Sequence, residues 1–106
     1  MKIPNSIIEK AIAIVRSVVA GTEIEVQAEI QDEGAFLLII AALPIENAEV
    51  IRTDALMSYE TQLLLQLPPL IRPKDNGDYS WMVVFTENGK VVHAVMDTAD
   101  LTTGTK

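Results

Sequence analysis

Residues 23–43 read EIEVQAEIQDEGAFLLIIAAL, and this stretch decides the fold. Its first part, 23–31, alternates between polar and apolar residues, which is typical of a β-strand with one buried face. The turn Asp32-Glu33-Gly34 follows. The next segment, 35–43, is apolar throughout, as in strands at the centre of a sheet that are covered on both sides. The stretch therefore predicts a β-hairpin.

The length of the turn determines which side chains of this hairpin share a face. A three-residue loop pairs Gln31 with Ala35, because the two strands then meet directly on either side of the turn. This register places on the core face Phe36, Leu38, Ile40 and Ala42. It places on the other face Leu37, Ile39, Ala41 and Leu43, beside Glu25, Gln27 and Glu29.

Helical periodicity appears on both sides of the hairpin. Apolar residues over 7–20 form two neighbouring stripes, which predicts a deeply buried helix. We expect Asn5 or Ser6 to cap its beginning and Gly21 to cap its end. A second helix is predicted over 53–67, ended by Pro68-Pro69. Residues 46–52 fit either the start of that helix or a short strand.

A second hairpin is predicted over 81–97, where two strands flank Asn88-Gly89, the preferred dipeptide of a two-residue turn. Counting back from the turn pairs Thr86 with Val91, Val84 with His93, and Met82 with Val95. The fold class is then α+β, in the order α-β-β-α-β-β. We expect one domain over 1–106 with an antiparallel sheet of four strands, or five if 46–52 is extended, and a frayed tail over 101–106.

The N-terminal helix covers one face of this sheet, and the other face is also apolar. Its cover is the second helix, a second copy of the chain, or a different protein, because monomers rarely expose such a large apolar patch. The expected interface residues on this face are Leu37, Ile39, Met82, Val84, Val91, His93 and Val95.

The net charge of −7 is concentrated in one region. Seven acidic residues and no basic residue lie between Ser17 and Ile51. Alternating glutamates on one strand are typical either of a solvated edge strand or of a surface that attracts a basic protein. An acidic chain argues against nucleic acid or anionic membrane as the main partner. The candidate partner-binding residues are Glu23, Glu25, Glu29, Asp32 and Glu33.

Little in the sequence indicates catalysis. The chain has no cysteine and one histidine, which excludes thiolate chemistry and a multi-histidine metal site within one chain. His93 and Asp97 are four residues apart on a strand, about 13 Å, which is too far for a hydrogen bond. We expect no cofactor or metal. The apolar run 35–43 is too short to span a membrane, and a cytoplasmic location is expected.

Three functions remain open. The first is a small acidic module that binds a basic protein by contact. Toxin-neutralising immunity proteins and secretion chaperones include chains similar in size, charge and class, an analogy at the level of fold. The second is a small-molecule-binding or enzymatic domain, with His93, Tyr59 and Asp97 in a pocket between the sheet and the second helix. The third is a structural homodimer.

Overall fold

The described residues form an α+β fold with one sheet and two helices. The computed structural model describes residues 3–44, 54–71 and 80–96. The elements, in chain order, are α1 (Asn5–Val18), β1 (Glu25–Gln31), the turn η1 (Asp32–Gly34), β2 (Phe36–Leu43), α3 (Asp54–Ile71), β3 (Ser80–Glu87) and β4 (Lys90–Met96). The fifth strand considered for residues 46–52 and the tail 101–106 lie outside the described residues.

The sheet is mixed, and the expectation of a purely antiparallel sheet is wrong. The strands lie in the order β1-β2-β3-β4, and each hairpin is antiparallel, but β2 and β3 run parallel. The connection between them contains α3, whose 18 residues extend about 27 Å at 1.5 Å per residue. A strand of eight residues such as β2 extends about 26 Å. The helix therefore carries the chain back to the end of the sheet at which β2 began.

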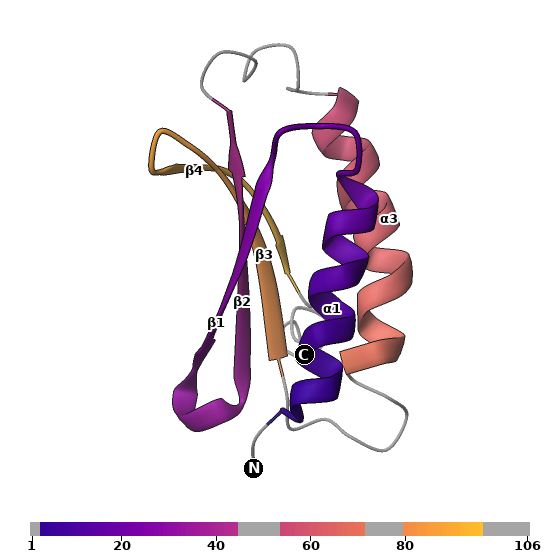
Figure 1. The fold of residues 1–106 in the computed structure, drawn as a ribbon, viewed down its shortest axis with the longest axis vertical. Coiled ribbons are helices and arrows are strands. Elements are labelled where there is room, and N and C mark those ends of the chain that lie inside the picture. Colours follow the sequence, from indigo (N-terminus) through magenta and orange to yellow (C-terminus); the bar gives the residue numbers. More distant parts are fainter. Residues whose placement is uncertain (1–2, 45–53, 72–79, 97–106) are drawn as a thin grey trace, which may run out of the picture.

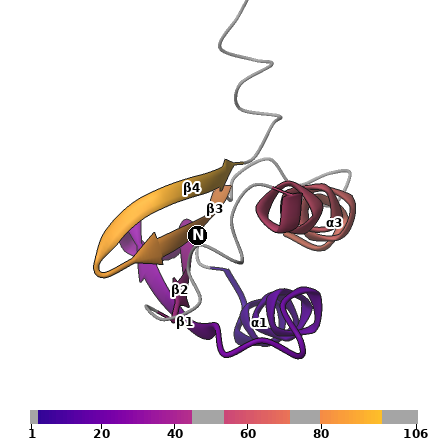
Figure 2. The same cartoon turned by 90° about the horizontal axis from the view of Figure 1, so that it is seen from above.

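Both helices lie on the same face of the sheet (Figure 1). Seen from above, α1 and α3 lie side by side, with all four strands to one side of them (Figure 2). The core lies between these two layers. Its largest buried side chains include Leu37, Ile39, Leu63, Trp81 and Phe85, each at most 1% exposed. The second helix is therefore not the cover of the opposite face.

The first hairpin has a different register from the expected one. Gln31 pairs with Phe36, so four residues rather than three separate the strands. Three consecutive turn residues, Asp32, Glu33 and Gly34, have left-handed backbone angles, with φ of 55°, 55° and 99°. The extra residue exchanges the two faces of β2, because side chains alternate along a strand. The odd-numbered residues Leu37 to Leu43 are buried beneath the helices.

The second hairpin confirms the predicted turn but not the predicted pairs beyond it. Asn88 and Gly89 have φ of 55° and 81°, as the two central residues of this tight turn require. Thr86 pairs with Val91 as expected. A β-bulge follows, and Phe85 then pairs with His93 and Val83 with Val95. One extra residue on β4 thereby turns the rest of this strand over.

The helix ends also differ from the sequence prediction. Helix α1 begins at Asn5 after Pro4, and no side chain caps it, so the expected capping by Asn5 or Ser6 is wrong. Gly21 has φ of 84° in the turn that follows the helix. Helix α3 continues through Pro68 and Pro69 to Ile71. Ile71 is fully buried, and this packing holds the last turn despite the hydrogen bonds that the prolines lack.

Candidate functional site

The candidate site is the face of the sheet that points away from the helices, which we call the open face. The strand pairs align its side chains in rows across β2, β3 and β4, for example Ile40 with Val84 and Val84 with Ala94. Val84 is 8% exposed, the other seven side chains are partly or fully exposed, and Met96 is 42% exposed. The open face consists of Phe36, Leu38, Ile40, Ala42, Met82, Val84, Ala94 and Met96.

Two glutamates extend this face onto β1. Glu25 pairs with Ala42 and Glu29 pairs with Leu38, so both carboxylates lie on the same side of the sheet as the apolar residues. Both are exposed, and Gln31 Nε2 donates a hydrogen bond of 3.4 Å to Glu29 Oε1. We call Glu25 and Glu29 the acidic row. The open face is therefore an apolar surface with negative charge along its β1 border.

The other predicted acidic residues lie outside the row. Glu23 is exposed before β1 begins, and Asp32 and Glu33 are exposed in the turn η1. The structure thus brings two of the five candidates onto the open face. It leaves the other three at the two ends of β1, where they add negative charge near the same edge of the sheet.

The structure divides the predicted apolar interface residues between the two faces of the sheet. Met82 and Val84 lie on the open face, and Val91 lies on the same side at the end of the hairpin, opposite Thr86. The placement of Leu37, Ile39, His93 and Val95 on that face is wrong. Leu37, Ile39 and Val95 are at most 2% exposed and belong to the core. Sequence reasoning instead missed Phe36, Leu38, Ile40, Ala42, Ala94 and Met96.

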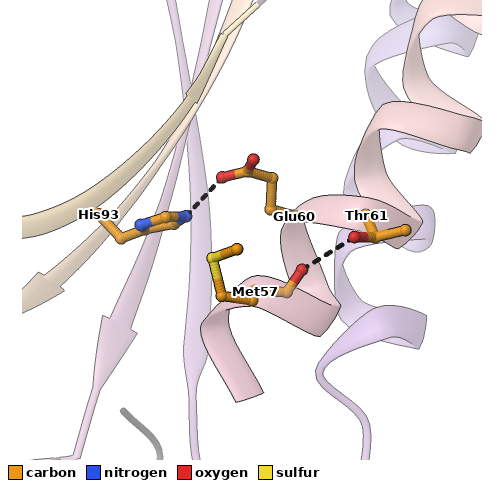
Figure 3. A network of polar contacts seen from close by, with 4 residues as sticks. All are labelled: Met57, Glu60, Thr61 and His93. Atoms are coloured by element: carbon orange, nitrogen blue, oxygen red, sulfur yellow. Dashed lines mark hydrogen bonds and ion pairs between the residues drawn. The ribbon is translucent and has the colours of Figure 1, made fainter. Parts of the chain in front are cut away.

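His93 connects the sheet to α3 (Figure 3). Its Nε2 lies 2.7 Å from Oε1 of Glu60, and the two side chains are 23% and 33% exposed. The ring of Phe85 lies between His93 and Tyr59, with centroid separations of 6.1 Å and 5.8 Å. A carboxylate oxygen accepts hydrogen bonds, so the imidazole nitrogen is the donor in this contact. This contact fixes β4 against the helix, and it faces away from the open face.

The surroundings of His93 offer little for catalysis among the described residues. The hydroxyl of Thr61, on the same helix as Glu60, donates to the carbonyl of Met57 at 3.1 Å. Buried leucines on α3, such as Leu56 and Leu63, fill the space between the helix and the sheet. Asp97, the third residue of the proposed enzymatic set, lies outside the described residues. The described part of the chain contains no cluster of three or more metal-ligating side chains.

Two hollows lined by described residues lie beside α1 rather than on the open face. One, of about 400 Å³, is lined mainly by Ile3, Ile8 and Ile30 near the turn η1. The other, of about 470 Å³, lies along the outer side of α1 at Ile12 and Arg16. The polar side chains that line them, Asn5 and Glu33 in the first and Glu9, Arg16 and Ser17 in the second, are all exposed, so neither hollow is an enclosed site of the kind that usually holds a small molecule.

None of the helices in the described residues has the length and hydropathy to cross a membrane. The expected cytoplasmic location stays a prediction. A comparison of the chain with protein-family models, with curated proteins and with solved structures finds no match.

Proposed function

We propose that the protein acts by contact and binds a basic protein partner through the open face. The observation that carries this proposal is the placement of both helices on one side of the sheet. Leu38, Ile40 and Val84 lie on the opposite side next to the acidic row. An apolar surface with charges at its border is the usual anatomy of a protein-binding site.

The dimensions of the open face favour an amphipathic helix as the segment that binds. Phe36 and Ala42 are six residues apart on β2, about 20 Å, and four strands extend over about 14 Å. A helix is about 10 Å wide, and 13 residues of it are about 20 Å long. A helix is also the element that covers an apolar sheet face in two-layer domains. One helix of this length therefore matches the open face.

Charge defines the chemistry of this helix. Its apolar side would contact Leu38, Ile40 and Val84, and lysine or arginine residues along one flank would face Glu25 and Glu29. Exposed ion pairs contribute about 0.2–1 kcal/mol each, so two pairs at about 0.7 kcal/mol each raise the affinity roughly tenfold. Its larger effects are on the association rate and on the choice of partner.

The test uses a synthetic 14-residue peptide with leucines along one helical face and lysines elsewhere, titrated into the isotope-labelled protein. We expect the largest amide shifts over 36–42 and 80–86. The double variant Glu25→Gln/Glu29→Gln should weaken binding about tenfold and reduce its salt dependence. Glu9→Gln, an exposed glutamate on α1, is the matched control and should leave the affinity unchanged.

Two control peptides decide the interpretation. One has the same composition in a scrambled order, and the other carries glutamate in place of lysine. Equal binding of either peptide, or shifts that map to α1 and α3, would contradict the proposal. Photo-crosslinking in the source cells then identifies the natural partner. A photoreactive residue at position 38 should capture it, and one at the exposed helix position 65 should not.

A further inference from the structure

We propose that two copies of the chain pair through β4, antiparallel, and form one continuous eight-stranded sheet. This inference rests on the unpaired backbone edge of β4, a strand whose Val91 and Met96 also lie on the side of the open face, and it does not require a basic partner. In such a dimer both helix layers lie on one side of the sheet, and the two open faces join on the other side.

Strand β4 has the properties of an edge that another strand can join. It is the last strand of the sheet, so one side of its backbone has no neighbouring strand within the described chain. Its exposed apolar side chains include Val91 at 58%, Val92 at 41% and Met96 at 42%. Lys90 begins the strand beside the turn, and no Asp, Glu, Lys or Arg occurs in the rest of it, over 91–96. Natural sheets usually protect an exposed edge with such charges.

The opposite edge of the sheet carries this protection. Strand β1 has glutamate at 25 and 29 and glutamine at 27 and 31, all of them exposed. A second strand added there would lie beside the acidic row. The asymmetry between the two edges therefore assigns β4, and not β1, as the strand that pairs.

Regular pairing of β4 is possible over its second half. The bulge lies between Phe85 and Thr86 on the partner strand, next to the turn, and the pairs Val84 with Ala94 and Met82 with Met96 keep one register. A two-fold axis at Ala94 would place His93 of each copy opposite Val95 of the other, so that no like charges meet. Opposite residues of an antiparallel pair share a face, and His93 and Val95 do so in this sheet.

Among the possible arrangements of two copies, the charge of the chain favours pairing through β4. Two molecules of net charge −7 repel each other, and much of that charge lies at β1 and its flanks. Pairing through β4 places the two acidic rows at the outer edges of eight strands, about 34 Å apart at 4.8 Å per strand. This distance exceeds the Debye length of about 8 Å at physiological salt. In a different dimer, with the two open faces packed against each other and β1 above β1, the two acidic rows would be about 10 Å apart.

Light scattering of the purified full-length chain at 10–100 µM tests the pairing. We expect a mass twice the 11.6 kDa of one chain. Val92→Lys and Met96→Lys should each weaken the dimer at least tenfold. Leu65→Lys is the matched control, because Leu65 is an apolar residue on α3 that is 72% exposed. It should leave the dimer intact, as should Leu38→Lys on the open face.

Other outcomes would overturn the proposal. A wild-type chain that remains monomeric at 100 µM excludes it. A dimer that dissociates in the Leu38→Lys or Leu65→Lys variant, but stays intact in the two β4 variants, also excludes it. A second measurement needs no variant. Hydrogen exchange of the amides over 92–96 should slow as the wild-type concentration rises, while exchange over 25–31 stays constant. A concentration-independent rate over 92–96 would contradict pairing through β4.

Discussion

The register of β2 predicts opposite consequences for two identical residues that are adjacent in sequence. Ile39 is fully buried beneath the helices, and its neighbour Ile40 lies half-buried on the open face. Truncation of Ile39 to alanine removes three carbons from a closed core, about 2.4 kcal/mol of transfer free energy at 0.8 kcal/mol per carbon. The cavity that remains raises the cost to about 3–4 kcal/mol. Ile40→Ala removes the same atoms from a site open to solvent and should cost about 1 kcal/mol.

Urea denaturation, followed by the fluorescence of the single tryptophan, measures both values. Trp81 is 1% exposed in the core, so its emission reports unfolding. With an m-value of about 1.5 kcal/mol per M, Ile39→Ala should lower the midpoint by about 2 M and Ile40→Ala by less than 1 M. If Ile40→Ala costs as much as Ile39→Ala, or more, the assignment of the two faces of β2 is refuted.

Three further predictions concern turns and contacts. Gly89→Ala should lower the free energy of unfolding by about 1 kcal/mol, because φ of 81° is unfavourable for alanine. No atom lies within 4 Å of the added Cβ, so the cost comes from the backbone angle alone. Asn88→Gly should change the free energy of unfolding by less than about 0.5 kcal/mol. Glu33→Gly should raise the free energy of unfolding by about 0.5 kcal/mol, because it removes a non-glycine residue with left-handed backbone angles. A lower free energy of unfolding in urea denaturation would contradict the inference that the backbone is strained at Glu33. A double-mutant cycle of Glu60→Ala with His93→Phe should give a coupling of about 0.5–1 kcal/mol, and additive effects would show that the 2.7 Å contact contributes nothing.

Local signals in the sequence predict the elements well. The alternation over 23–31, the apolar run that follows it and the Asn88-Gly89 turn correspond to β1, β2 and the β3–β4 turn of the structure. Each of these signals depends on neighbouring residues within one element. Element type is therefore the part of this fold that its sequence specifies most directly.

The register of each hairpin depends on one extra residue, and the sequence contains no clear sign of that residue. Ala35 continues the apolar run, so nothing distinguishes it as part of a four-residue turn. The bulge at Val92 lies within Val91-Val92-His93, where no glycine or other turn residue indicates an extra position. Each miscount by one exchanges the two faces of a strand. The parallel contact of β2 with β3 likewise depends on the length of α3, which continues past the expected stop at Pro68.

The error in the register of β2 does not change the apolar character that is predicted for the candidate site. Both faces of β2 are apolar, so either register places an apolar row beside Glu25 and Glu29. The residues that form this row could not be predicted without the turn length. The position of α3 beside α1, which leaves the opposite face open, depends on tertiary packing that no local pattern describes.

Side-chain accessibility in the native state tests the central claim most directly. This claim is that both helices cover one face of the sheet and that no other described element covers the opposite face. The chain has no cysteine, so a single introduced thiol reports its own position without background. Leu38 and Met82 are partly exposed, so Leu38→Cys and Met82→Cys should react with a thiol reagent in the folded protein, at rates that do not depend on unfolding. Ile39→Cys should react only as fast as the protein unfolds. Protection of positions 38 and 82 to the level of position 39, in dilute monomeric protein, would contradict the account.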